Sequence, residues 1–258
     1  MFRKNFLAVT LLSSAVAILP QDSSAGQINE KAVRCRAAVL VYQHIGRLRA
    51  NPSQAERNVT TSPAAFERHM KLLKDEAFSV IPYDYLVSCM SGGPATPPKA
   101  VVITFDDGLK SQYTRALPIL EKYGHEAIFF VVTDFVGSGS RLLDWNEVLD
   151  LERRGMVIGS HTKTHPWLTR CTDERLGDQL RGSKSRLESE LDHPVGHLAY
   201  PFGAMDDRVK KAAAEAGYRS ARSISRGTDH VSADLFGVRI VYVTDSLRFF
   251  RRAVSSAG

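Results

Sequence analysis

Cysteine is scarce in this sequence, with Cys35, Cys89 and Cys171 as the three examples among 258 residues. At most one intramolecular disulfide can form, which excludes the small scaffolds that depend on several disulfides for stability. Their spacing also fits no cysteine metal motif. Since 43% of the residues are hydrophobic, we expect a hydrophobic core to stabilise the chain instead.

Long apolar runs are also missing. The longest run, residues 6–19, follows Arg3 and Lys4 and precedes the small residues Ser23 and Ala25. It is too short for a comfortable transmembrane helix, so the pattern predicts a signal peptide over residues 1–25 and a domain over residues 26–258. A retained membrane anchor is the less favoured alternative. We therefore expect an exported protein, periplasmic or extracellular, with peripheral contact to the cell envelope.

Blocks of one charge, internal repeats and low-complexity segments are absent as well. The net charge of +6 is spread along the chain, which is weak evidence for a nucleic-acid partner. We expect no nucleic-acid binding, and the oligomeric state cannot be predicted from these features.

Short apolar segments alternate with helical patterns along the rest of the chain. Such alternation is typical of an α/β fold with parallel strands, in an open sheet or a closed barrel. The expected strands are residues 37–42, 78–83, 100–105, 126–132, 156–161, 197–203, 218–224 and 237–243. The expected helices are residues 61–76, with Ser62 as N-cap and Pro63 in the first turn, and residues 144–154, 173–191 and 206–216.

Polar or unusual residues follow four of these strands. Asp106 and Asp107 follow "VVITF", His161 follows "MVIGS", His44 lies just after "VLVY", and "PFG" follows "HLAY". Because the carboxyl ends of parallel strands share one edge of the sheet, these residues are expected to meet at one site.

The two aspartates and two histidines predict a metal site. His161 and His165 in "SHTKTH" can point to one spot, and two imidazoles with one carboxylate suit a divalent ion such as Zn²⁺. One aspartate would bind the ion while its neighbour acts as general base. The alternatives are two surface histidines and a solvated Asp-Asp-Gly turn, although an apolar strand leads into that turn.

These motifs resemble those of the polysaccharide deacetylases with a nodulation-type domain, carbohydrate esterase family 4. "TFDDG", "SHTKTH" and "AYPFG" are similar to that family's first three motifs, and the resemblance covers roughly residues 36–245. The segments "ALPILEKYGHEAIFFVVTDFVG" and "VTTSPAAFERHMKLLKDEAFSVIPYDYL" look like the branch that deacetylates poly-N-acetylglucosamine. The resemblance implies a single-domain, distorted (β/α)7 barrel with parallel strands.

It also implies roles for individual residues. Asp106 would be the general base, and Asp107, His161 and His165 would bind the divalent metal, with Zn²⁺ as the expected ion. The backbone N–H of Phe202 would help to hold the oxyanion. The reaction would be removal of N-acetyl groups from an N-acetylglucosamine-containing polysaccharide, with release of acetate.

The sequence departs from the family pattern in two places. Ala199 replaces an arginine that orients the catalytic aspartate, and we expect Arg239 to substitute for it unless Arg239 is a surface residue. Gln43 replaces the histidine that usually acts as acid. His44 is the candidate acid, although strand alternation would turn it to the opposite face from Gln43 unless the chain bends there.

Other functions fit parts of the pattern. A peptidoglycan deacetylase or a xylan O-acetyl esterase would use the same metal site, and a non-haem iron oxygenase would use two histidines and one carboxylate. The Gln43 replacement keeps open a carbohydrate-binding homologue that has lost turnover. Trp167 would either stack on a sugar ring or be an aromatic of the site's rim or of the core.

Overall fold

The computed structural model describes residues 35–243 and 245–256. The predicted signal peptide over residues 1–25 lies outside the described residues. Within the described ranges, no helix combines the length and the apolar character that crossing a bilayer requires.

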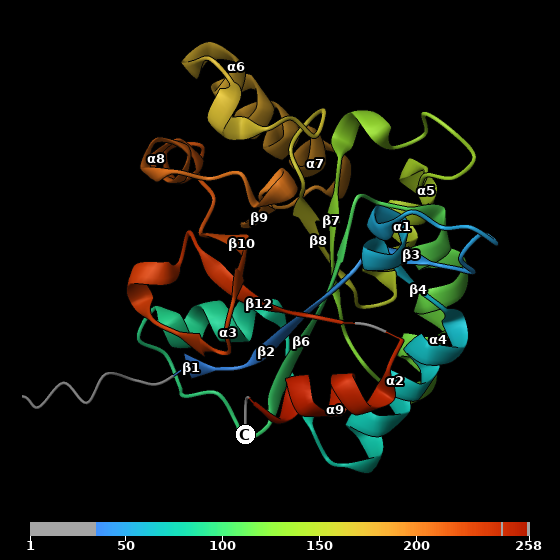
Figure 1. Cartoon of the computed structure of the whole chain (residues 1–258). Helices are drawn as coiled ribbons and strands as arrows, with labels where there is room; N and C mark the ends of the chain where they lie inside the picture. The colour runs from blue at the N-terminus through green and yellow to red at the C-terminus, as the bar shows by residue number, and fades with distance from the viewer. Residues whose placement is uncertain (1–34, 244, 257–258) are drawn as a thin grey trace, which may run out of the picture. The chain divides into compact units, whose positions relative to one another are not determined.

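Seven parallel strands close into a barrel (Figure 1). Around the barrel, each strand pairs in parallel with the next, and the last strand returns to the first. In order around the barrel, they are β2 (Ala38–Tyr42), β6 (Ala100–Asp106), β7 (Ile128–Val131), β8 (Val157–Ser160), β9 (His197–Ala199), β10 (Ser220–Arg226) and β12 (Val238–Tyr242). The short strand β5 (Ser79–Val80) also pairs with β6. The closed alternative, a (β/α)7 barrel, is therefore confirmed.

All eight predicted strands are present, although β5 is only two residues long. Two small pairs were not predicted because each strand has two residues and no visible periodicity. They are the antiparallel pair β1 (Cys35–Arg36) and β11 (Asp229–His230), and the parallel pair β3 (His44–Ile45) and β4 (Thr60–Thr61).

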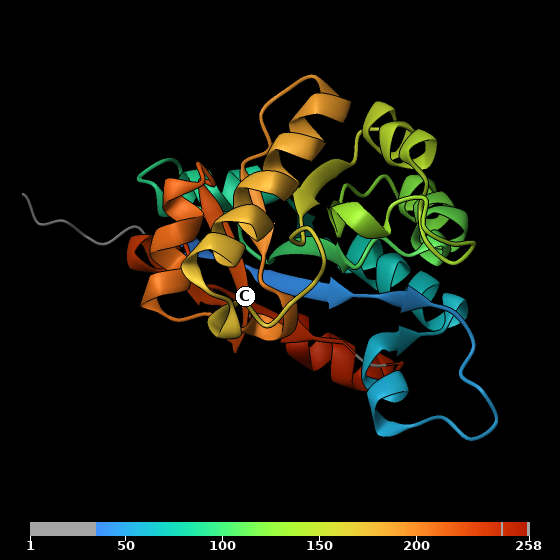
Figure 2. The same cartoon turned by 90° about the horizontal axis from the view of Figure 1, so that it is seen from above.

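Helices lie around the barrel strands, as Figure 2 shows from above. Ser62 accepts a hydrogen bond from the Ala65 N–H and Pro63 begins the helix, as the capping pattern predicts. The predicted helices are α2 (Pro63–Asp75), α5 (Trp145–Arg153), α8 (Asp207–Glu215) and the run of α6 (Asp173–Gly177), η4 (Asp178–Gly182) and α7 (Ser183–Leu191). The helices beyond our prediction are α1 (Gln54–Val59), α3 (Tyr83–Met90), α4 (Leu117–Tyr123) and α9 (Leu247–Ser255).

Alternate residues of each barrel strand face different apolar clusters. In β6, Val101, Ile103 and Phe105 pack in a cluster that includes residues of α2, α4 and α9. Ala100 and Val102 belong to a second cluster, with strand residues such as Phe130 and Val238 and with residues of α3. Since side chains alternate along a strand, Asp106 has the same orientation as Val102, toward the second cluster.

One disulfide is present in the described residues, between Cys35 of β1 and Cys89 of α3. Cys171 is a free, buried thiol. This pairing agrees with the limit of one disulfide that the cysteine count sets. It ties the first described strand to a helix 54 residues further along the chain.

A buried histidine joins the barrel to two helices. His69 of α2 stacks on Phe250 of α9 at 3.9 Å between ring centroids, and its Nδ1 lies 3.1 Å from the Tyr42 hydroxyl of β2. Burial lowers the pKa of His69 from 6.5 to about 4. The folded protein therefore holds His69 neutral in a pH range where the unfolded chain protonates it.

We predict that His69→Gln makes stability less sensitive to acid. Between pH 6.5 and about 4 the unfolded state binds a proton that the folded state does not. The free energy of unfolding of the wild type therefore decreases as the pH is lowered, by up to about 3 kcal/mol from His69. Glutamine can still accept from Tyr42 but does not titrate. Urea denaturation of both proteins at pH 7 and pH 4.5 measures the difference, and equal losses of stability would contradict the assignment.

Candidate active site

Asp106 ends β6 inside the barrel and is almost fully buried. Its two carboxylate oxygens each lie 2.5 Å from Nη2 of Arg222. An isolated carboxylate in this position would be costly to bury, and the guanidinium compensates its charge.

Arg222 comes from β10 and is only 2% exposed. Its register partners on the neighbouring strands are Ala199 of β9 and Val238 of β12, both members of the second cluster. Its guanidinium lies over the Phe130 ring, 5.5 Å from the centroid. Arg222 therefore projects into the barrel, beside the position where the family resemblance places an arginine.

The prediction that Arg239 orients Asp106 is wrong, because Arg222 pairs with Asp106 instead. Arg239 lies in β12 between Val238 and Ile240, which are both buried in the second cluster. Alternation therefore turns Arg239 outward, where it is 46% exposed and lies 3.6 Å from Asp234. The sequence analysis missed Arg222, although an arginine inside a predicted strand was the available signal, because a buried arginine requires a carboxylate partner.

Asp107 leaves the strand with a left-handed backbone, at φ 77°. This conformation interrupts the strand alternation that would otherwise turn it away from Asp106. Its Oδ1 lies 3.5 Å from Nε2 of His161 and 3.5 Å from Nε2 of His165. Both predicted histidines and one predicted aspartate are thus brought together.

His161 follows β8 and is buried. Its Nδ1 lies 2.8 Å from the Ala199 carbonyl, an acceptor only, so Nδ1 carries the proton and donates it. Nε2 is then left with a lone pair in neutral imidazole, facing Asp107. This arrangement is typical of a metal-binding histidine whose second nitrogen is fixed by a backbone acceptor.

His165 lies in the loop after β8, which is not helical. Thr162 shapes this loop, because its N–H donates to Ser160 Oγ and its own Oγ1 accepts from the His165 N–H. Thr162 and His165 both have positive φ, at 68° and 57°. Such backbone conformations in non-glycine residues are costly and tend to gather at functional sites.

Electrostatic coupling shifts the pKa values in this group. Burial would raise the pKa of Asp107, but His161 in its imidazolium form, protonated on both nitrogens, donates to this carboxylate, and its charge together with His165 and Arg222 holds the pKa below the ordinary value. Burial opposes a charged His161, yet the two aspartates raise its pKa. Burial and the neighbouring His161 lower the pKa of His165. The ionised Asp107 carboxylate thus lies between two imidazole nitrogens, a donor set that suits a cation.

Asp107, His161 and His165 fit a divalent metal. One ligand atom from each lies within 4.8 Å of the others. Two imidazoles and one carboxylate leave coordination positions for water or substrate. Asp106 pairs with Arg222 instead, so the two adjacent aspartates have different partners.

We call Asp107, His161 and His165 the metal-binding group, after the role that their donor atoms suit. An aromatic surface borders this group. Phe202 of η5 (Pro201–Gly203) packs edge-on against His165 and stacks on Trp167 at 4.6 Å and 6° between planes. Both rings are exposed, Phe202 at 45% and Trp167 at 44%, so the core alternative for Trp167 does not hold. Phe202 has φ 58°, and its N–H donates to no acceptor in the described part of the chain.

Family comparison agrees with this geometry. Residues 93–221 match the family model described as polysaccharide deacetylase. The chain belongs to the polysaccharide deacetylase family. The matched range contains the metal-binding group, Asp106 and Phe202, and it ends one residue before Arg222.

Two relatives are similar to part of this chain. A peptidoglycan-N-acetylglucosamine deacetylase of Bacillus cereus is 34% identical over 123 residues, covering 47% of this chain and 55% of that protein. The poly-beta-1,6-N-acetyl-D-glucosamine N-deacetylase of Escherichia coli K12 is 29% identical over 122 residues, covering 42% of this chain and 18% of that protein. This chain therefore spans little more than half of the first relative and less than a fifth of the second.

A solved structure supports the fold. The Streptococcus pyogenes deacetylase PplD in complex with acetate matches with a TM-score of 0.78 at 23% identity. The match covers 86% of this chain and 99% of PplD.

The strand end at Gln43 separates His44 from the metal-binding group. β2 stops at Tyr42, and His44 pairs with Thr60 in the separate β3–β4 ladder, with Nδ1 3.4 Å from Thr60 Oγ1. Gln112 of η1 (Gln112–Ala116) ties the two strand ends together, since its Nε2 donates to the carbonyls of Asp106 and Gln43. The structure does not bring His44 into contact with the metal-binding group.

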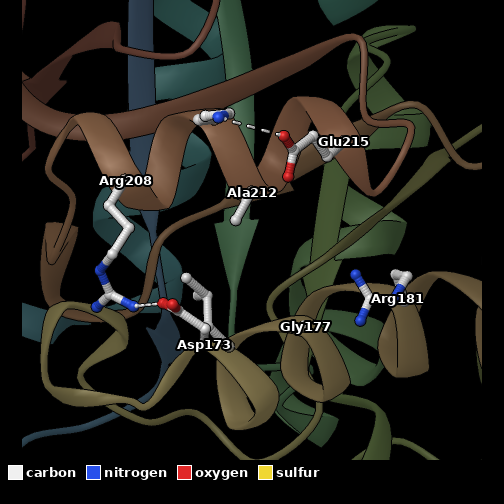
Figure 3. A pocket seen from close by; sticks show the side chains of 8 residues that line it. Asp173, Gly177, Arg181, Arg208, Ala212 and Glu215 are labelled. Atoms are coloured by element: carbon white, nitrogen blue, oxygen red, sulfur yellow. Dashed lines mark hydrogen bonds and ion pairs between the residues drawn. The ribbon is translucent and has the colours of Figure 1, made fainter.

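A separate pocket of about 350 Å³ lies between α6 and α8 (Figure 3). Its charged side chains are largely paired, with Arg208 2.7 Å from Asp173 and Lys211 3.8 Å from Glu215. It contains none of the metal-binding residues, so it is not the candidate active site.

We predict that Arg222→Gln strongly destabilises this protein. Breaking a buried pair leaves Asp106 without a compensating charge, which costs about 3–5 kcal/mol. The double variant Asp106→Asn/Arg222→Gln removes both charges and should recover a large part of that loss. Urea denaturation of the wild type, both single variants and the double variant gives the coupling. Additive losses would show that the two side chains do not interact.

Proposed function

We propose that this protein is a metal-dependent hydrolase that removes N-acetyl groups from an N-acetylglucosamine-containing polysaccharide and releases acetate. The observation that carries this proposal is the placement of Asp107, His161 and His165 in one group beside Asp106. A separate carboxylate is thus available for proton transfer next to a complete set of metal ligands.

Asp107, His161 and His165 would hold the divalent cation, with Zn²⁺ as the expected ion. When bound, such a cation acidifies water and polarises the amide carbonyl. The donor set supports this assignment because the His161 tautomer presents Nε2 to the group.

Asp106 acts as general base in the proposed reaction. It accepts a proton as a water oxygen attacks the acetamide carbonyl carbon, while Arg222 fixes the orientation of its carboxylate. The backbone N–H of Phe202 donates to the oxyanion that develops on the carbonyl oxygen. When the C–N bond breaks, the amine nitrogen takes up a proton and acetate leaves.

We assign the return of that proton to Asp106, which holds it after the first step. His44 is the other candidate, but it contacts Thr60, and burial together with Arg115 and Arg141 lowers its pKa. A lower pKa leaves less of the imidazolium that would donate the proton. Asp106 can therefore serve as base and then as acid.

The substrate class rests on the aromatic surface and on the named relatives. Trp167 and Phe202 present exposed stacked rings beside His165, and aromatic faces pack well against the apolar faces of sugars. Of the relatives described above, one is named a peptidoglycan-N-acetylglucosamine deacetylase and the other a poly-beta-1,6-N-acetyl-D-glucosamine N-deacetylase. Export to the periplasm or cell exterior fits the residue 1–25 pattern and the Cys35–Cys89 disulfide.

We predict acetate release from N-acetylated polymers. Poly-β-1,6-N-acetylglucosamine, chitin oligosaccharides, peptidoglycan and acetylxylan form the panel, and acetate is measured with and without a strong chelator. The chelator should abolish release, and added Zn²⁺ should restore it. Full activity after rigorous metal removal would refute the metal role, and release from acetylxylan alone would indicate an ester hydrolase.

We also predict that substitutions of the two aspartates have different effects on metal binding and on turnover. Asp107→Asn should weaken Zn²⁺ binding because it removes a charged ligand. Asp106→Asn should keep the ion but lower turnover by roughly 10² to 10⁴, as for a lost general base. Zn²⁺ content after dialysis and acetate release are measured on both variants. Equal loss of metal in both would remove the basis for separate roles.

A further inference from the structure

A second polar pocket lies beside the proposed site. It has a volume of about 430 Å³ and is lined by His44 of β3, Arg47, Pro63 of α2 and Arg115 of η1. We call these four residues the cationic pocket. Its wall η1 is tied to the active-site strands, because Gln112 donates to the Asp106 carbonyl. In Figure 1, β3 lies beside the barrel, next to β4 and α1.

The positive charges of this pocket have no acidic partner in the part of the chain that the structure describes. Within residues 35–243 and 245–256, neither Arg47 nor Arg115 pairs with a carboxylate, and Arg115 donates only to the Ile45 carbonyl at 3.0 Å. Glu56 of α1 is the acidic residue that follows Arg47 in the sequence, but its carboxylate is already paired with Arg49. Uncompensated cations that converge on a pocket attract anions.

The environment of the pocket lowers the pKa of His44. Burial, then Arg115 and Arg141, lower the pKa of His44. Its Nδ1 faces Thr60, while its Nε2 has no partner in the described residues. Neutral His44 with a proton on Nε2 can thus offer a further hydrogen-bond donor to an anion.

Gly46 allows these groups to come together. A Cβ at this position would lie 2.2 Å from His44 Cε1 and 3.0 Å from Arg115 Nη1. Any larger residue would push both side chains away. The close approach of a backbone lacking Cβ is therefore part of how the pocket is built.

We propose that the cationic pocket binds an oxyanion carried by the polysaccharide, a carboxylate or a phosphate group on a sugar near the one that is deacetylated. This inference rests on the proposed function and narrows its substrate to an acidic glycan. Guanidinium groups match both oxyanions in bidentate geometry. The pocket shares η1 with the active-site edge, so one glycan chain can occupy both.

Binding of simple sugars tests the pocket without any turnover. The full chain with ¹³C-labelled histidine is titrated with glucuronic acid, glucose 6-phosphate and glucose, none of which carries an acetyl group. We expect at least one charged sugar to shift the His44 signal and to bind about tenfold more tightly than glucose. A preference for one of them identifies carboxylate or phosphate as the source.

Matched variants locate the effect. Arg47→Gln/Arg115→Gln should lose the preference for charged sugars, whereas Arg252→Gln, which removes one exposed charge from α9, should keep it. Circular dichroism verifies that the double variant is folded. Equal binding of charged and neutral sugars, or a preference that survives in the double variant, would overturn the proposal. Acetate binding as tightly as the charged sugars would also overturn it and indicate a product site.

Deacetylation kinetics provide a second test of the pocket. On an acidic N-acetylated glycan the double variant should raise KM about tenfold, and added salt should reduce the difference from wild type. If the wild type deacetylates no polymer but still binds charged sugars through Arg47 and Arg115, the proposed function fails and the pocket stands. If acetate is released with no effect of the double variant on any acidic glycan, the pocket fails and the function stands.

Discussion

The buried ion pair between Asp106 and Arg222 is the constraint on which the site depends. The two residues come from β6 and β10, which β7, β8 and β9 separate in the barrel wall. The pair therefore forms only when the barrel is closed, and both charges are too deeply buried to remain without each other. The position of the proposed general base is therefore linked to closure of the barrel by one contact across it.

This pair also explains the Asp-Asp doublet. Arg222 compensates Asp106, so Asp107 is left to the histidines and to the cation that we propose they hold. The division requires unusual backbone conformations, because adjacent strand residues would otherwise point apart. Four non-glycine residues at the site have positive φ: Asp107, Thr162, His165 and Phe202. The strain is located where side chains from several strand ends must face one point.

Local patterns were enough to predict most of the fold and the metal-binding group. Apolar periodicity and capping residues place the strands and longer helices, and polar residues at strand ends place Asp107, His161 and His165. The arginine could not be assigned, because the choice between Arg222 and Arg239 depends on which strand face lines the barrel interior. Arg222 of β10 is the register partner of Ala199 of β9. The arginine beside Asp106 therefore lies on the strand next to the one where the family pattern places it. The strand end at Tyr42 was predicted correctly, but the pairing of His44 with Thr60 was not, because β3 and β4 have only two residues each and show no periodicity.

The most direct test of this account is a crystal structure of the full chain soaked with Zn²⁺, with the ion located by its anomalous scattering. The account predicts one strong peak bound by the Asp107 carboxylate and by Nε2 of His161 and His165, with Asp106 still paired to Arg222. An ion bound through Asp106, or an Arg222 side chain turned away from Asp106 in the loaded protein, would contradict it.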